Sequence, residues 1–214
     1  MAKLFVGAQV QRPPKAGYAE KLPFAELVFP TSRPKASTLA KWRRTMPDGF
    51  AVALVAPRAC VASTTPYKAG EDLDAGRQWL REACASLDAL LVLPNYGLTT
   101  SRRDRTRLGD FVNSLADTRV VWAPGGLWEP EQARPFAAEL GIDCAVDPLK
   151  EAVLPAERVY ARMAALGARQ RFSEGILEEA LDAILEAGAA TNYVAIASPR
   201  ATREAANLIR IASM

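Results

Sequence analysis

Eight short apolar runs alternate along this chain with amphipathic segments, and this alternation restricts the fold more than any other feature of the sequence. Runs of this length, separated by segments with helical periodicity, are typical of βα units around a parallel sheet. The expected strands are Lys3–Gly7, Phe24–Phe29, Phe50–Ala56, Ala89–Leu93, Arg119–Trp122, Asp143–Val146, Val159–Met163 and Tyr193–Ala197.

Six of the intervening segments carry apolar residues at spacings of three and four, as expected for helices that cover a sheet. These segments are Ser37–Thr45, Asp72–Ser86, Arg102–Leu115, Pro130–Leu140, Ser173–Ala187 and Pro199–Ile211. Gly141 and Gly188 stand at C-cap positions, and Ser198 with Pro199 predicts an N-cap followed by a first turn. The helical pattern is weak after the first and sixth strands.

Eight βα units close most simply into a (β/α)₈ TIM barrel, and the chain is then one domain covering residues 1–214. This fold usually takes about 250 residues, with a lower limit near 200, so the predicted barrel is a compact one. An open, doubly wound sheet of the same units is the alternative, because a single sequence does not reveal strand order.

The amino-acid composition limits the kinds of catalytic site and metal site that we expect in this chain. The chain has no histidine, so the commonest general base and metal ligand is missing. The three cysteines, Cys60, Cys84 and Cys144, have no short spacing typical of a zinc site or a disulfide framework. No apolar run is long enough to span a bilayer, and the amino terminus lacks a secretory pattern. We expect a cytoplasmic protein without a metal site, a cofactor or a membrane partner.

The loops that follow the expected strands are strongly basic. They contain thirteen basic residues and two acidic ones, Asp147 and Glu151, in a chain that has 27 basic and 24 acidic residues in all. The basic residues are Arg12, Lys15, Arg33, Lys35, Arg58, Lys68, Arg102, Arg103, Lys150, Arg169, Arg171, Arg200 and Arg203. In a barrel these loops form the C-terminal face, so the sequence predicts a basic rim that attracts anionic ligands.

Several individual residues on this face are candidate ligand contacts. Ser198 and Arg200 lie where the last strand meets a helix N-terminus, and together with Arg169 and Arg171 they predict a phosphate site. Ordinary helix capping by Ser198 is the alternative explanation, and for this position it is the favoured one. Asn95, just after the fourth strand, is a further candidate ligand contact.

The segment Pro34–Arg58, PKASTLAKWRRTMPDGFAVALVAPR, resembles the bacterial YecE-like family, a family of unknown function. Its residues in register are Trp42, Thr45, Pro47, Phe50, Ala56, Pro57 and Arg58. Weaker matches follow in order at Leu93–Pro94, at Tyr160 and Arg162, and in the final strand and helix. The resemblance implies a TIM-barrel-like fold with no assigned activity.

The chain also departs from that family at strand ends. Val55 replaces a lysine, Ala164 replaces a histidine, and Ala197 with Ser198 replaces a pair of asparagines. Glu26 matches an acidic position if the alignment is shifted by one residue. If the family's polar set performs chemistry, the resemblance therefore implies that this chain is a pseudoenzyme.

Two functions remain open. The first is binding of a phosphate-bearing ligand or a nucleic acid at the basic face. The second is a metal-independent hydrolase or lyase acting on a phosphorylated or sugar-acid substrate, with Glu26 as base, Tyr160 as acid, and Arg58 with Arg162 as anion clamps. Arg58 and Arg162 can instead form a structural ion pair with Glu26, and a purely structural role in a larger complex is a third alternative.

Overall fold

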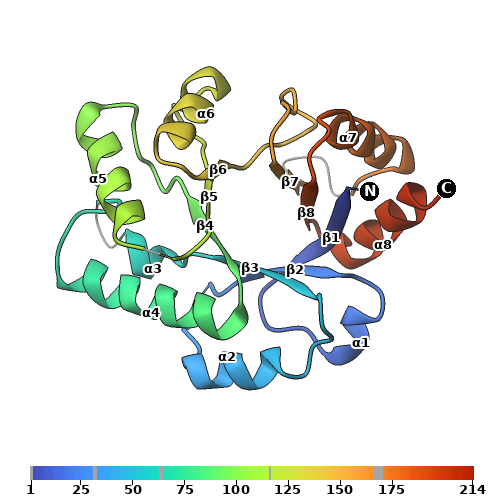
Figure 1. The fold of residues 1–214 in the computed structure, drawn as a ribbon, viewed down its shortest axis with the longest axis horizontal. Helices are drawn as coiled ribbons and strands as arrows, with labels where there is room; N and C mark the ends of the chain where they lie inside the picture. Colours follow the sequence, from blue (N-terminus) through green and yellow to red (C-terminus); the bar gives the residue numbers. More distant parts are fainter. Residues whose placement is uncertain (1, 31–32, 63–64, 116, 166–170) are drawn as a thin grey trace.

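The computed structural model describes residues 2–30, 33–62, 65–115, 117–165 and 171–214. Eight parallel strands form one sheet in the order β6-β5-β4-β3-β2-β1-β8-β7 (Figure 1). The strands are β1 (Lys3–Val10), β2 (Phe24–Val28), β3 (Ala51–Val55), β4 (Leu90–Pro94), β5 (Val120–Ala123), β6 (Asp143–Cys144), β7 (Arg158–Ala164) and β8 (Thr191–Ala197).

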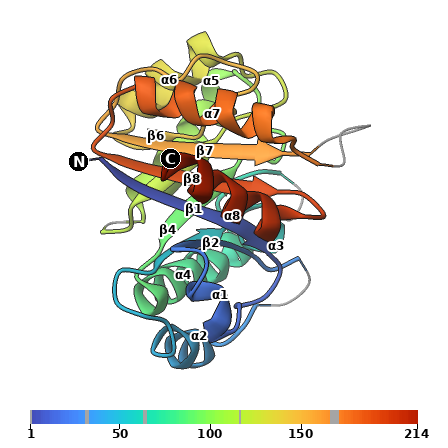
Figure 2. The same ribbon diagram turned by 90° about the vertical axis from the view of Figure 1, so that its right-hand side faces the viewer.

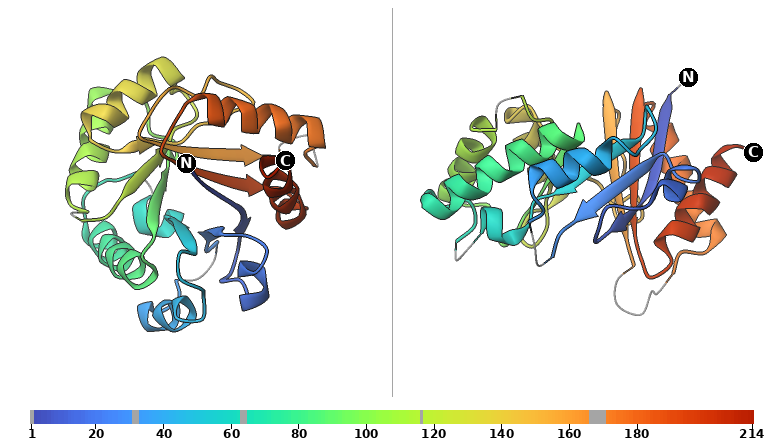
Figure 3. Two further views of the ribbon diagram at one scale, coloured as in Figure 1. Left: turned by 45° about the vertical axis from the view of Figure 1, so that its right-hand side comes forward. Right: turned by 90° about the horizontal axis from the view of Figure 1, so that it is seen from below.

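The sheet closes on itself between its two outer strands. Just after β6, the Val146 N–H donates to the Tyr160 carbonyl (3.0 Å), and the Arg162 N–H donates to the Val146 carbonyl (2.8 Å). The predicted (β/α)₈ barrel is thus confirmed, and the open doubly wound alternative is excluded. Figure 3 shows the strands around a common centre with the helices outside them.

Helices follow most strands along the chain. They are α1 (Ala16–Ala19), α2 (Ala36–Arg43), α3 (Arg58–Val61), α4 (Glu71–Leu87), α5 (Arg102–Asn113), α6 (Pro130–Glu139), α7 (Glu174–Glu186) and α8 (Ala201–Ala212). The two segments with weak helical patterns differ from the rest as expected: α1 has four residues, and the described chain between β6 and β7 contains no helix. Figure 2 shows α7 and α8 beside β7, β8 and β1.

The strand residues alternate between two environments, which separates the core into layers. Phe24 of β2 faces a cluster made of strand residues and of Ala145 just after β6, whereas Ala25 and Leu27 pack among the helices. The cluster around Phe24 is the barrel interior. Because successive strand side chains point to opposite faces, Glu26 also points inward, two residues beyond Phe24.

Two helix boundaries differ from the sequence expectation in an informative way. The short α3 begins at Arg58, directly after Pro57, and its presence was not predicted. The last helix begins at Ala201 with Arg200 as its N-cap residue, so the prediction that Ser198 caps a helix beginning at Pro199 is wrong. The Ser198 hydroxyl has other partners, described below.

Candidate anion site at the barrel mouth

The lower part of the barrel interior is filled by aromatic rings. Phe5 stacks on Tyr193 with ring centroids 5.1 Å apart, and Phe24 lies 5.7 Å from Tyr193 and 6.2 Å from Tyr160. Each of these residues lies in the first half of its strand or in the middle of it. The rings therefore form a floor below the C-terminal mouth.

Glu26 lies on this floor and is completely buried. Its carboxylate accepts four hydrogen bonds: from Gln9 Nε2 (2.7 Å), from the Tyr160 hydroxyl (2.8 Å), and from Arg162 through Nη2 and Nε (both 2.9 Å). The partners come from β1 and β7, which brings together residues 136 positions apart in the chain. Burial of a carboxylate costs free energy unless hydrogen bonds replace its lost hydration, and here each oxygen accepts two bonds.

Arg162 uses only one edge of its guanidinium in this pair. A guanidinium has five N–H donors, and the pair with Glu26 takes one from Nε and one from Nη2. Among the residues that the structure describes, the Nη1 edge therefore has no partner, and the side chain, which is 27% exposed, borders the mouth cavity. Burial alone would lower the pKa of Arg162, but the charge and hydrogen bond of Glu26 raise it above its ordinary value, so the group stays cationic.

Tyr160 holds its proton firmly. Burial, followed by the negative charge of Glu26, raises the pKa of Tyr160 well above 10. The phenol therefore acts as a hydrogen-bond donor to Glu26 over the whole physiological pH range.

A cavity of about 830 Å³ lies above the pair, among the C-terminal ends of the strands. It exists because the inward positions above the aromatic floor hold small side chains, among them Ala123, Ala145 and Ala195. Its polar and charged lining consists of Gln9, Gln11, Glu26, Glu129, Arg134, Asp147, Lys150, Glu151, Arg162 and Ser198. The volume is within the range of small-molecule sites.

Arg58 has a different environment from Arg162. Its guanidinium lies 5.8 Å from the centroid of the Tyr96 ring and, within the described chain, contacts no carboxylate. The Tyr96 hydroxyl donates to the Ala56 carbonyl (2.8 Å); burial raises the pKa of Tyr96, while the charges of Arg58 and Arg162 oppose that shift. Both arginines therefore act electrostatically on Tyr96, but only Arg162 pairs with Glu26.

Arg33 and Cys60, which follow β2 and β3 in the chain, lie close to each other. Arg33 Nη1 lies 4.0 Å from Cys60 Sγ. Burial raises the pKa of Cys60, although the Arg33 charge opposes this shift, so the thiol stays protonated at neutral pH.

Asn95 connects two loops and does not line the cavity. Its Nδ2 donates to the carbonyls of Gly125 (2.7 Å) and Leu98 (3.2 Å), and the indole N–H of Trp128 reaches the same Leu98 carbonyl (3.2 Å). Asn95 Oδ1 is buried and has no partner in the part of the chain that the structure describes.

The start of α8 holds a carboxylate of the protein itself. The buried Glu204 accepts hydrogen bonds from the Ser198 hydroxyl and from the Phe172 N–H (2.9 Å). Ser198 Oγ also accepts from the Arg200 N–H (3.0 Å). Arg171 and Arg200 are exposed, and Arg169 lies outside the described residues.

The basic rim consists of exposed side chains. Of the twelve rim residues in the described chain, only Lys150 forms an ion pair with a carboxylate there, Asp147 (2.5 Å). The other eleven are Arg12, Lys15, Arg33, Lys35, Arg58, Lys68, Arg102, Arg103, Arg171, Arg200 and Arg203. Their charge therefore remains available to a ligand that crosses the rim.

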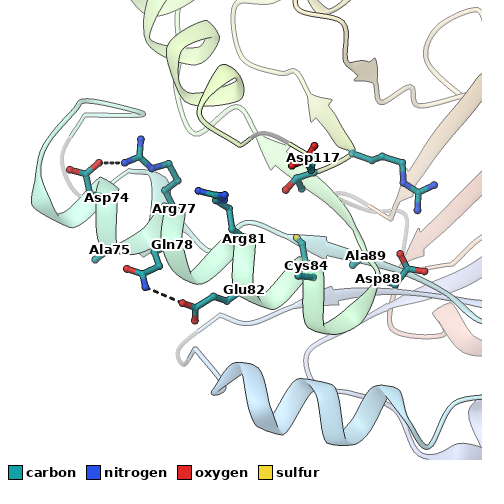
Figure 4. A pocket seen from close by; sticks show the side chains of 13 residues that line it. Asp74, Ala75, Arg77, Gln78, Arg81, Glu82, Cys84, Asp88, Ala89 and Asp117 are labelled. Carbon is teal, nitrogen blue, oxygen red and sulfur yellow. Dashed lines mark hydrogen bonds and ion pairs between the residues drawn. The ribbon is translucent and has the colours of Figure 1, made fainter.

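A second hollow, of about 1,020 Å³, runs along α4 on the outside of the barrel (Figure 4). Its charged side chains include the Arg77–Asp74 ion pair (2.7 Å), and Gln78 donates to Glu82 (3.0 Å). It also reaches Asp88 and Arg119, which precede β4 and β5, so it lies away from the strand ends that carry the mouth cavity.

Sequence reasoning missed several of the residues that shape the cavity. Gln9 lies beyond Gly7, the expected end of the first strand, because β1 continues to Val10. The period-two alternation from Phe5 through Gly7 could have revealed Gln9 as an inward residue. Arg134 lies within the helix expected over Pro130–Leu140 and Glu129 directly precedes it, and no local signal places either residue at a cavity.

Some broader features concern the described chain as a whole. No helix there has the length and apolar character needed to cross a membrane. Nor does any group of three or more His, Cys, Asp or Glu residues there lie in an arrangement that could hold a metal ion.

No protein-family model matches the sequence, and no curated protein matches it. Solved structures do resemble the fold. A DUF72 family protein from Enterococcus faecalis superposes with a TM-score of 0.79 at 14% identity, covering 100% of this chain and 99% of that one. SacUVDE gives 0.69 at 7% identity, covering 100% and 98%. Methylaspartate ammonia lyase from Clostridium tetanomorphum gives 0.58 at 9% identity, covering 100% of this chain and 58% of that enzyme. At these identities the likeness shows a shared TIM-barrel fold.

Proposed function

We propose that this barrel binds an anionic small molecule in its mouth cavity, through the edge of the Arg162 guanidinium that faces away from Glu26. The observation that carries the proposal is the two-bond pairing of Arg162 with Glu26. This pairing fixes the guanidinium plane and leaves a second donor pair at the cavity. Such a planar pair of donors matches the two oxygens of a carboxylate or a phosphate.

We further propose that the chain is a divergent, non-catalytic relative of the YecE-like family. The likeness to the DUF72 protein supports a common fold. Arg58 and Arg162 are two of the positions at which this sequence resembles the YecE-like family. Val55, Ala164 and Ala197 stand where the family has polar residues. A binding role needs fewer reactive groups than catalysis, and it agrees with these replacements.

The hydrolase or lyase alternative fits the geometry less well. Glu26 accepts four hydrogen bonds, so its carboxylate has no position left for a substrate proton. Tyr160 is buried, and its proton points to Glu26 rather than to a ligand. In the proposed anion-binding role, the hydrogen bonds to Glu26 hold its carboxylate in position, and the carboxylate in turn orients Arg162.

Crystals soaked in sodium bromide test the proposal directly, since bromide is an anion with anomalous scattering. We expect an anomalous peak within hydrogen-bond distance of Arg162 Nη1. Arg158 is an internal control, because its Nε pairs with Asp143 (3.0 Å) at the other end of β7. Bromide peaks at rim arginines with none at Arg162 would contradict the proposal.

A second candidate, a nucleic-acid partner, rests on the eleven rim cations that are exposed and form no ion pair in the described chain. Polyanion binding through such groups depends steeply on salt. Fluorescence anisotropy with a labelled single-stranded oligonucleotide tests it. The logarithm of the binding constant should fall linearly with the logarithm of the salt concentration. The Arg102→Glu/Arg103→Glu double variant should reduce this slope. Absence of binding at low salt would remove this candidate and leave the cavity proposal intact.

A further inference from the structure

One part of the wall of the mouth cavity is apolar and made of small side chains. Ala123, Ala145 and Ala195 form part of the barrel interior, and Ala164 and Ala197 continue the wall toward the solvent. Alanine side chains offer no hydrogen bonds, so the part of a ligand that lies against this wall gains mainly from burial of its own apolar surface. The body of the ligand is therefore expected to be apolar.

Most cations that line the cavity already pair with carboxylates, so the lining can pair with one anionic group of a ligand. Arg134 pairs with Glu151 (2.7 Å), and Lys150 pairs with Asp147 (2.5 Å), so both cations are already matched by carboxylates. A further carboxylate, Glu129, also lines the cavity and forms no ion pair within the described chain. The free edge of Arg162 is thus the one cationic surface of the described lining that does not face a carboxylate.

We infer that the ligand of this cavity is a small monocarboxylate with an apolar body; this inference rests on the proposed anion-binding function. A carboxylate matches the free edge of Arg162 in shape and carries a single charge. A phosphate dianion would bring two negative charges to the guanidinium that already holds Glu26, one more than a carboxylate brings. Repulsion from Glu26 and Glu129 grows with each added charge, so the lining disfavours dianions and polyanions.

Three matched probes separate the inference from the proposal on which it rests: phenylacetate, its neutral amide phenylacetamide, and phenyl phosphate. Binding to the full chain is measured by calorimetry and by saturation-transfer NMR at pH 7.5. We expect phenylacetate to bind about tenfold more tightly than phenylacetamide, because only the anion engages the guanidinium. We also expect it to bind more tightly than phenyl phosphate.

A pH series adds a second readout. The second pKa of a phosphate monoester is about 6, so phenyl phosphate becomes largely a monoanion at pH 5.5. Its affinity should therefore rise between pH 7.5 and 5.5, whereas that of phenylacetate should not.

Two alanine variants test the location of the site. Ala197→Leu narrows the cavity, keeps both members of the Glu26–Arg162 pair, and should weaken phenylacetate binding at least tenfold. Ala40→Leu, at a half-buried position in α2, is the matched control and should not change the affinity.

The outcomes are distinguishable. If phenyl phosphate binds more tightly than phenylacetate at pH 7.5, and Ala197→Leu removes that binding, the monocarboxylate inference is overturned and the proposed function stands. If neither anion binds, or if phenylacetamide binds as well as phenylacetate, both are overturned. If Ala197→Leu leaves phenylacetate binding unchanged, the anion site lies elsewhere and both fail.

Discussion

Substitution of Glu26 by glutamine removes the negative charge opposite Arg162 and keeps the size and shape of the side chain. The native carboxylate is completely buried and accepts hydrogen bonds from Gln9, Tyr160 and, twice, Arg162. A glutamine has one oxygen and one NH₂ group, so the guanidinium would lose its charged partner and face a competing donor.

The expected loss of stability follows from burial. Removing one partner of a buried ion pair typically costs about 3–5 kcal/mol, because the remaining charge is left uncompensated. Arg162 is 27% exposed on its cavity side, so water can hydrate part of the guanidinium and the cost should lie at the lower end. We expect a loss of about 3 kcal/mol, which for a chain of this length lowers Tm by roughly 6–12 °C.

Urea unfolding followed by circular dichroism and tryptophan fluorescence measures this loss. Glu174→Gln is the matched control, because Glu174 pairs with Arg210 at the surface, where both side chains are more than half exposed. An exposed pair of this kind contributes about 0–1 kcal/mol. If Glu26→Gln costs no more than Glu174→Gln, the claim that the pair holds a buried charge in place is refuted.

Three further predictions follow. Gly76→Ala in α4 should cost about 1–3 kcal/mol or more in urea unfolding, since an added Cβ would lie 2.2 Å from a backbone oxygen of α3; Gly175→Ala in α7, where the space is open, should not. Burial raises the pKa of Cys84 and of Cys144 to about 12 from the ordinary 9.0, so their contribution to stability is full below pH 9 and lost as pH rises toward 12. The urea midpoint of the native chain should decrease as the pH is raised from 8 to 10.5, and that of Cys84→Ser should decrease less. An equal decrease in the native chain and in Cys84→Ser would contradict this. Tyr160→Phe should cost about 1–3 kcal/mol, because the hydroxyl is a buried hydrogen bond to a charged group, and an unchanged urea midpoint would count against the network.

The barrel could be predicted because its strands have strong local patterns. The run at β3, with Pro47 before it and Pro57 after it, is apolar throughout and too short for a helix. The weak pattern between β6 and β7 likewise indicated the missing helix. Closure depends on pairing between segments far apart in the chain, and no local pattern specifies the bridge between Val146 and Ala161.

The candidate site could be predicted only in part. Arg58 and Arg162 both follow from the sequence, but their different environments depend on strand register and loop path. Arg162 reaches Glu26 across the barrel, whereas Arg58 lies at the start of α3 and packs on Tyr96. The rim prediction counted charges in loops and could not show that the cavity inside the rim carries more carboxylates than cations.

The side-chain Nε–H signal of Arg162 in a ¹H–¹⁵N NMR spectrum, identified by its loss in Arg162→Lys, reports on the central claim most directly. The Nε atom lies 2.9 Å from a Glu26 oxygen, so the signal should be protected from exchange with water. It should then shift when phenylacetate is added and stay unchanged when phenylacetamide is added. A signal that neither anion nor amide shifts would contradict the account of an anion held at Arg162.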